Sequence, residues 1–181
     1  MAKLISKTYG DALFELAVEE GKIDVLLEEV EQLQKILAEN EDFGRLMNHP
    51  KIIKEEKTEV AKSVFEGRVS EELFGFLTII ISKDRYREIN EILKYFVATV
   101  KEHKGIGIAT VTTAVPLKDG QRREVEQKLL DTTQYKSMEI SYGVDASLIG
   151  GMVIRIGDRV VDSSIKTKLN ELQKDLLKVQ I

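Results

Sequence analysis

The hydrophobic pattern of this chain changes near Lys104, and this change limits the possible folds more than any other feature of the sequence. Before Lys104, apolar residues recur every three or four positions, which is the spacing of amphipathic helices. The clearest such stripe is Ile23, Leu26, Leu27, Val30, Leu33 and Leu37. After Lys104, "GIGIATVTTAVPL" is rich in β-branched residues and predicts a strand from Ile106 to Ala114 or Val115. We therefore expect a helical part followed by a part that contains a sheet.

Helix breakers and caps divide residues 1–104 into six helices. Pro50 closes a short third helix, Gly67 ends the fourth, and Ser70 followed by two glutamates begins the fifth. A long sixth helix follows from Tyr86. Because short connections between amphipathic helices are typical of helical bundles, we predict a six-helix bundle for this part of the chain.

Residues 105–181 are expected to follow the order β-α-β-β-α. The first strand is followed by a helical pattern in "KDGQRREVEQKLLDTT" and by strand alternation in "SMEISY". A tight Gly157-Asp158 turn then joins two further strands, and Ser163 or Ser164 caps the last helix. We therefore predict an α+β chain, in which the N-terminal six-helix bundle is followed by a small C-terminal β-α-β-β-α domain.

The composition argues against several classes of function. The net charge of −4 and the lack of a basic face or an aromatic stacking strand argue against nucleic-acid binding. Because the chain has no cysteine, disulfides, thiol nucleophiles and thiolate metal sites are impossible. The N-terminus lacks an apolar signal segment, and the longest apolar run, "LTIIIS", is too short to span a bilayer. We therefore expect a soluble chain without direct membrane insertion.

The glycines do not have the arrangement of a phosphate-binding loop. Gly150-Gly151 and the Gly105-x-Gly107 pair precede strands, whereas a phosphate loop places its glycines between a strand and a helix N-terminus. The adjacent pair instead suits a bulge or a close approach of backbone.

No group of residues has the spacing of a catalytic or metal site. Asp158 and Asp162 are interpreted as a turn residue and a strand-end or cap residue, since no base or oxyanion donor lies near them in the sequence. His49 and His103 are isolated from other metal-ligand types. We therefore predict that the chain is not an enzyme and has no catalytic, cofactor-binding or metal-binding residues.

The first and fifth helices carry apolar residues on two faces. The first helix has a broad face of Ile5, Tyr9, Ala12, Leu13, Leu16 and Ala17 and a second face of Leu4, Phe14 and Val18. The fifth has a broad face of Leu73, Phe76, Leu77 and Ile80, with Phe74, Ile79 and Ile81 pointing elsewhere. Such a helix is either buried all round or binds a partner helix in a groove, and the sequence leaves both interpretations open.

The last helix has a narrow apolar stripe that is equally ambiguous. Its members are Ile165, Leu169, Leu172 and Leu176. This stripe either docks on the sheet of its own domain or leaves room for a partner helix.

Two long segments resemble a known family. "YGDALFELAVEEG" from Tyr9 to Gly21 resembles the first-helix pattern of the δ subunit of bacterial F-type ATP synthase, known in mitochondria as the oligomycin-sensitivity-conferring protein. "DASLIGGMVIRIGDRVVDSSIKTKLNEL" from Asp145 to Leu172 resembles the C-terminal signature of that family, and "AVPL" before the middle helix also fits. Order, spacing and length match over essentially the whole chain.

Gly10 departs from this pattern, because the family usually has alanine there. A glycine inside a helix costs about 1 kcal/mol relative to alanine. We therefore expect the start of the first helix to be looser than in other members.

The resemblance implies a non-catalytic subunit of the peripheral stalk, or stator, without a cofactor. Residues 1–104 would bind the N-terminal helices of α subunits on the α/β catalytic hexamer, and residues 105–181 would bind the C-terminal ends of the b subunits. The stalk would then stop the hexamer from turning with the rotor. The same resemblance implies a peripheral location at the cytoplasmic face of the bacterial cell membrane.

The resemblance also suggests candidate contact residues, element by element. The groove between the first and fifth helices is expected to receive an α-subunit helix, with the candidates Tyr9, Ala12, Leu13, Leu16, Leu77 and Ile81. The signature residues are interpreted first as fold-specifying and second as b-subunit contacts; they are Leu148, Gly150, Gly151, Gly157, Asp158 and Asp162.

Three rival functions remain to be weighed. A free-standing adaptor with the same fold would recognise an amphipathic helix of another partner. A small β-α-β-β-α domain also occurs in nucleic-acid modules, although the charge of this chain argues against that function. An enzyme is the third class, and the sequence shows no catalytic constellation for it.

Overall fold

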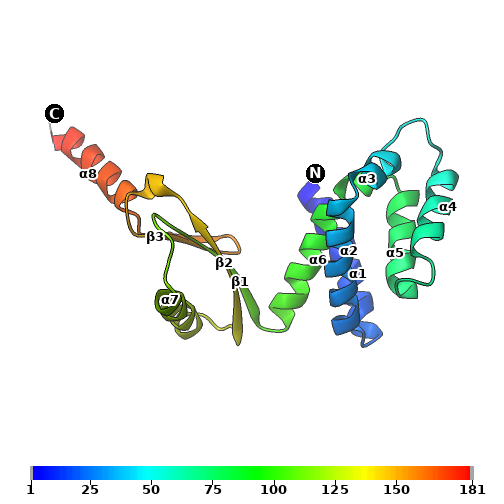
Figure 1. Cartoon of the computed structure of the whole chain (residues 1–181), viewed down its shortest axis with the longest axis horizontal. Coiled ribbons are helices and arrows are strands. Elements are labelled where there is room, and N and C mark those ends of the chain that lie inside the picture. The colour runs from blue at the N-terminus through cyan, green and yellow to red at the C-terminus, as the bar shows by residue number, and fades with distance from the viewer. Residues whose placement is uncertain (1, 180–181) are drawn as a thin grey trace. The chain divides into compact units, whose positions relative to one another are not determined.

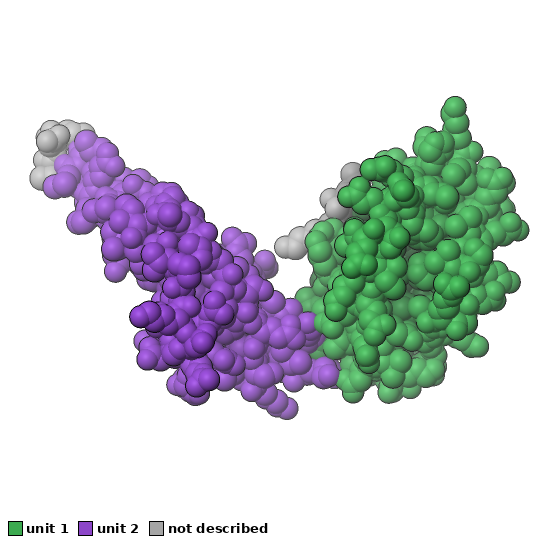
Figure 2. All heavy atoms as spheres, viewed as in Figure 1, with its two compact units in different colours: residues 1–100 green, residues 101–181 purple. Residues whose placement is uncertain are grey.

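The computed structural model describes residues 2–179 and contains helices and a four-stranded sheet (Figure 1). The α+β class predicted from the sequence is confirmed. The chain divides into two compact units, residues 1–100 and 101–181, which Figure 2 colours separately. The division lies four residues before the predicted boundary at Lys104, and the last helix of the first unit continues to His103.

The first unit is built from helices. They are α1 (Ala2–Glu19), α2 (Ile23–Glu39), α3 (Glu41–Met47), α4 (Lys54–Phe65), α5 (Glu71–Ser82), the 3-10 turn η1 (Tyr86–Glu88) and α6 (Ile89–His103). The stripe predicted for α2 supplies core residues, since Leu26, Val30 and Leu33 are buried. The core residues of α6 follow the same spacing and are Ile89, Ile92, Leu93, Phe96, Val97 and Val100. Removing such apolar side chains from water is the main source of stability for this unit.

Polar contacts join the start of α5 to α2. The Glu29 carboxylate accepts hydrogen bonds from the Ser70 backbone N–H at 3.1 Å and from the Ser70 hydroxyl at 2.6 Å. The Ser70 hydroxyl in turn accepts from the Leu73 N–H and caps α5, as the sequence predicts. Lys22 and Glu72 form an ion pair beside this cap. These contacts fix the position of α5 against α2.

Gly10 lies where α1 crosses α6. It is buried, and a Cβ atom at this position would overlap the ring of Tyr95. The Tyr95 hydroxyl donates a hydrogen bond to the Asp11 carboxylate at 2.9 Å, so the ring is held against α1. The glycine therefore has a packing role that its low helix propensity did not indicate.

The second unit contains a mixed sheet with the order β2-β1-β3-β4. Its elements are β1 (Ile106–Thr113), α7 (Asp119–Thr132), β2 (Ser137–Val144), the 3-10 turn η2 (Ala146–Leu148), β3 (Met152–Ile156), β4 (Arg159–Asp162) and α8 (Ile165–Val179). β1 and β2 are parallel, because α7 connects them as a crossover, and the other neighbours are antiparallel. The predicted Gly157-Asp158 turn is confirmed, since Ile156 pairs with Arg159 across it.

One face of the sheet packs against α7 and forms a small core. Val111 in the central strand is fully buried and pairs with Tyr142 on one side and Ile154 on the other. The buried members of this core are Ala109, Val111, Leu129 and Met138. β1 ends at Thr113, before the predicted Ala114 or Val115, and the Thr113 hydroxyl bonds to the Val115 carbonyl where the chain leaves the sheet.

Candidate partner-binding surfaces

Three of the six predicted α-subunit contacts lie in the core of the first unit. Leu13 is 1% exposed, Leu77 is 3% exposed and Ile81 is 4% exposed. α1 and α5 turn these side chains toward the other helices of the unit. Leu13 and Leu77 belong to the broad apolar faces, and Ile81, which the sequence placed on the second face of α5, is buried as well. These three side chains are therefore core residues of the unit, and their role as partner contacts stays a prediction.

The other three predicted contacts lie on α1 at the border of its buried stripe. Tyr9 and Leu16 are half-buried, and Ala12 is exposed. At 100° per residue these positions fall on one side of α1, next to the stripe that contains Leu13. They remain available to a partner.

The second apolar faces of α1 and α5 are at least partly open to solvent. On α1, Leu4 and Val18 are exposed and Phe14 is half-buried. On α5, Ile79 is exposed and Phe74 is half-buried. Burial all round, one of the two interpretations that the sequence left open, is therefore wrong for both helices. Each helix keeps apolar surface that a partner can cover.

α8 presents an exposed apolar stripe in the second unit. Leu172 is 60% exposed and Leu176 is 68% exposed, and Ile165, Leu169 and Leu177 are exposed as well. Among residues 165–178 of this helix, only Thr167 is half-buried and none is buried. The interpretation that α8 docks on its own sheet is therefore wrong. The stripe recurs every three or four residues, as in a helix that packs against another helix.

The start of α8 is fixed by a dense set of hydrogen bonds. The Asp162 carboxylate accepts from the Ser164 N–H at 2.8 Å and from the Thr167 hydroxyl at 2.7 Å. These bonds lower the pKa of Asp162, because they stabilise its charged form. The Ser164 hydroxyl accepts from the Thr167 N–H at 3.2 Å, so Ser164 is the cap that the sequence placed at Ser163 or Ser164. Asp162 thus supports a helix cap.

The glycine pair of the signature brings the η2 loop against this helix start. Gly151 has a φ of +76°, and a Cβ atom there would overlap the Ser163 carbonyl oxygen. The Gly150 carbonyl accepts from the Ile165 N–H at 3.0 Å, and a Cβ at Gly150 would lie 2.7 Å from the Ile165 side chain. This close approach is one of the two structural roles that the sequence allowed for the pair.

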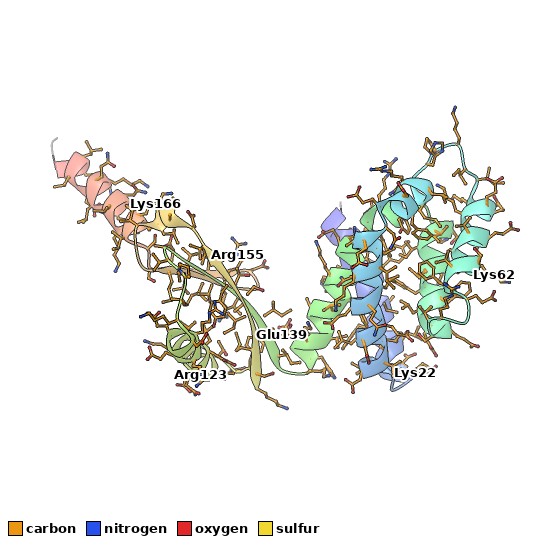
Figure 3. All side chains as sticks on the ribbon, in the orientation of Figure 1. Lys22, Lys62, Arg123, Glu139, Arg155 and Lys166 are labelled. Carbon is orange, nitrogen blue, oxygen red and sulfur yellow. The ribbon has the colours of Figure 1, made fainter. Side chains whose placement is uncertain are left out.

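Two further features fix the η2 loop beside α8. Leu148 is buried, and the Lys166 ammonium donates to the Ser147 hydroxyl at 3.2 Å; Figure 3 labels Lys166 at the start of α8. Gly157 and Asp158 lie apart from this contact, in the exposed β3–β4 turn. Four of the six signature residues therefore surround one junction, and two form a turn.

Ile149 is a surface residue that the sequence analysis did not single out. Its φ of 67° lies in the left-handed region, which a β-branched residue rarely adopts, and its side chain is exposed. Its neighbour Gly150 carries the backbone bond to α8. No local sequence signal predicts an isoleucine in this conformation, because isoleucine disfavours it.

The described residues contain no group of three or more His, Cys, Asp or Glu that could hold a metal ion. His49 accepts a hydrogen bond from the Lys51 N–H within its own loop. None of the helices within residues 2–179 has both the length and the apolar character needed to cross a membrane. The fold thus comprises two units, each with exposed apolar helix residues.

Comparison with known proteins identifies the family. Residues 5–176 match the family model described as "ATP synthase delta (OSCP) subunit". An ATP synthase subunit delta of Lachnoclostridium phytofermentans is 52% identical over 181 residues, which cover 100% of both chains. The subunit delta of Brevibacillus brevis is 36% identical over 169 residues, 93% of this chain and 96% of the relative. The chain belongs to the ATP synthase delta (OSCP) subunit family, and it is a structural subunit with no catalytic role.

A solved structure supports the fold independently. A chain in the cryo-EM structure of the Toxoplasma gondii mitochondrial ATP synthase hexamer matches with a TM-score of 0.79. The match covers 95% of this chain and 97% of that chain at 18% sequence identity. At this identity the likeness concerns the fold alone.

Proposed function

We propose that this subunit of the F-type ATP synthase links the α/β catalytic hexamer to the membrane-anchored b subunits and resists the torque of the rotor. A link that carries torque must hold both attachments at the same time, so it needs two separate binding surfaces on folded units. Each unit of this chain carries exposed apolar helix residues. The observation that carries the proposal is the open leucine stripe of α8, because an exposed apolar stripe of this kind marks a surface that binds another protein.

The first unit would bind an N-terminal helix of an α subunit. We assign the contact to the border residues Tyr9, Ala12 and Leu16 of α1, together with Phe74 and Thr78 of α5. On each helix these positions adjoin the buried stripe and are half-buried or exposed. α2 packs against both α1 and α5 and supports the two elements from within the unit.

The second unit would bind the C-terminal ends of the b subunits through α8. An amphipathic helix of the partner would cover Leu169, Leu172 and Leu176. The backbone strain at Ile149 supports this assignment, because an exposed side chain in a costly conformation often serves a function outside the isolated fold. In the assembled complex the chain would be a peripheral subunit at the cytoplasmic face of the bacterial membrane.

The α8 assignment is tested by binding of the full chain to a soluble fragment of the cognate b subunit. The double variant Leu172→Gln/Leu176→Gln removes two exposed apolar side chains and should weaken binding at least 100-fold. Lys174→Gln, on the opposite side of α8, is the matched control and should bind as the unmodified chain does. Unchanged binding by the double variant would refute the α8 assignment.

The first-unit assignment is tested by calorimetric titration of the full chain with a peptide of the cognate α-subunit N-terminus. One-to-one binding is expected, and Ala12→Glu should weaken it at least tenfold. Ala98→Glu places the same charge at an exposed alanine of α6 and should have no effect. Binding of a scrambled peptide with equal affinity would instead favour a general helix adaptor.

A further inference from the structure

Three exposed aliphatic side chains lie at one end of the sheet, beside the start of α8. Val115 is 67% exposed, Val144 is 58% exposed and Ile149 is 64% exposed. They belong to three segments, which are the loop after β1, the last residue of β2 and the loop between β2 and β3. Large apolar side chains that are exposed together mark surfaces that bind other proteins. We call these three residues the sheet-end surface.

The topology of the sheet brings these segments together. β2 and β3 pair with opposite edges of β1, so the loop between them has to cross the end of β1. Thr113, the last residue of β1, pairs with Val144 of β2 on one side and with the first residue of β3 on the other. Its carbonyl accepts from the Asp145 N–H at 2.8 Å, and its hydroxyl donates to the Val115 carbonyl at 2.7 Å. Val115 therefore leaves β1 directly beside the loop that carries Ile149.

The sheet-end surface adjoins the apolar stripe of α8. Ile149 precedes Gly150, whose carbonyl accepts from the Ile165 N–H at 3.0 Å. A Cβ atom at Gly150 would lie 2.7 Å from the side chain of Ile165, the first member of the stripe. Figure 1 shows the loop between β2 and β3 beside the start of α8. The stripe of α8 thus leads directly to the sheet-end surface.

The α8 stripe alone is small for a stable attachment. From Ile165 to Leu176 it extends over about 17 Å of helix, at about 1.5 Å per residue. A stable protein–protein interface buries about 800 Å² of each partner and involves about 20–30 residues a side. The stripe residues and the positions that flank them on one helix supply only part of that area. A partner that holds this chain against torque therefore needs further surface, and the sheet end supplies it next to the stripe.

The sheet-end surface is also held in place before any partner binds. Leu148, directly before Ile149, is buried, and the Asp145 carboxylate accepts from the Ser147 N–H at 2.9 Å. The φ of Ile149 is 67°, a conformation that an exposed isoleucine keeps only where the surrounding structure imposes it. A partner therefore meets side chains in fixed positions, and little conformational entropy is lost on binding.

We propose that the partner helix that covers the α8 stripe continues across the end of the sheet and contacts Val115, Val144 and Ile149. This inference rests on the proposed function, because the partner is the C-terminal end of a b subunit. The partner helix must then be longer than the α8 stripe, and its apolar face must extend over the part that lies on the sheet.

The sheet-end surface is tested by binding of the full chain to a soluble fragment of the cognate b subunit. The double variant Val115→Gln/Val144→Gln should weaken binding at least tenfold, because it makes two exposed apolar side chains polar. Ile108→Gln is the matched control, since Ile108 is 41% exposed in β1 and lies on the other face of the sheet from buried Ala109. This control should bind as the unmodified chain does. Nitrogen-15 spectra check that each variant is folded.

The outcomes separate the sheet-end surface from the α8 assignment. The expected result is weaker binding in both Val115→Gln/Val144→Gln and Leu172→Gln/Leu176→Gln. A loss in the α8 variant alone would overturn the sheet-end surface and leave the proposed function in place. Unchanged binding by the α8 variant would overturn both, because the partner helix would then not lie on α8. A check without any variant is that the amide signals of residues 144–149 shift when the fragment binds, and unshifted signals would also overturn the sheet-end contact.

Discussion

Where α1 crosses α6, one side chain, Tyr95, decides whether replacing Gly10 by alanine raises or lowers the stability of the first unit. Replacing Gly10 by alanine should stabilise an isolated helix by about 1 kcal/mol, because alanine has the higher helix propensity. In this protein the new methyl carbon would overlap one atom of the Tyr95 ring, and it would lie 3.3 and 3.4 Å from two further atoms of that ring. Overpacking of this kind typically costs about 1–3 kcal/mol. We therefore expect Gly10→Ala to destabilise the first unit by up to about 2 kcal/mol.

Removing the ring should reverse this sign. In a Tyr95→Ala background the methyl group has room, so Gly10→Ala should stabilise the unit by about 1 kcal/mol. Tyr95→Ala alone should be destabilising, since it also removes the bond to Asp11. The measured quantity is the difference between the two effects of Gly10→Ala, which a double-mutant cycle isolates.

Amide hydrogen exchange of α1 and α6 is the suitable assay, because the chain has two units and a global melt combines them. The protection of these helices reports the free energy of opening the first unit. If Gly10→Ala has the same effect in both backgrounds, the Tyr95 contact does not explain the glycine. A stabilising effect in the unmodified background would show that the ring moves away without cost.

Three further outcomes are expected. Ile149→Gly should stabilise the second unit by about 1 kcal/mol, measured by hydrogen exchange of β3, because relief of strain exceeds the entropy cost of glycine; it should also weaken binding to the b subunit. The hydrogen bond from Lys22 lowers the pKa of Glu72 below its ordinary value of 4.5. The stability from this contact is therefore present above pH 4.5 and is lost as the pH falls through the lower pKa of the folded state. Below that pKa, the unmodified chain and Glu72→Gln should have the same free energy of unfolding in an acid titration. Asp162→Ala should reduce protection in the first turn of α8 by about 1 kcal/mol, whereas Asp158→Ala, in the nearby turn, should not.

Elements with a single strong periodicity were predictable from the sequence. The α2 stripe, the Ser70 cap and the Gly157-Asp158 turn are each recognised from residues that lie within a few positions of one another in the sequence. The structure contains each of them. The packing of Gly10 was not predictable, because it depends on Tyr95, which lies 85 positions away in the sequence. Ile149 was missed for the opposite reason, since its conformation runs against local preference.

The predicted contact residues show where periodicity stops being informative. A helix with two apolar faces has to turn one of them toward its own core, and the broader, more continuous stripe buries the larger area. Leu13, Leu77 and Ile81 were chosen as contacts for their hydrophobicity, which is also the reason why the fold buries them. The residues that stay open to a partner lie at the border of that stripe or on the second face. Ile81 belongs to the weaker face of α5 and is buried too, so periodicity alone does not say which residues of the weaker face stay open to a partner. For the single stripe of α8 the sequence likewise left two interpretations open, docking on its own sheet or binding a partner helix, and the structure removes the first because the stripe is exposed.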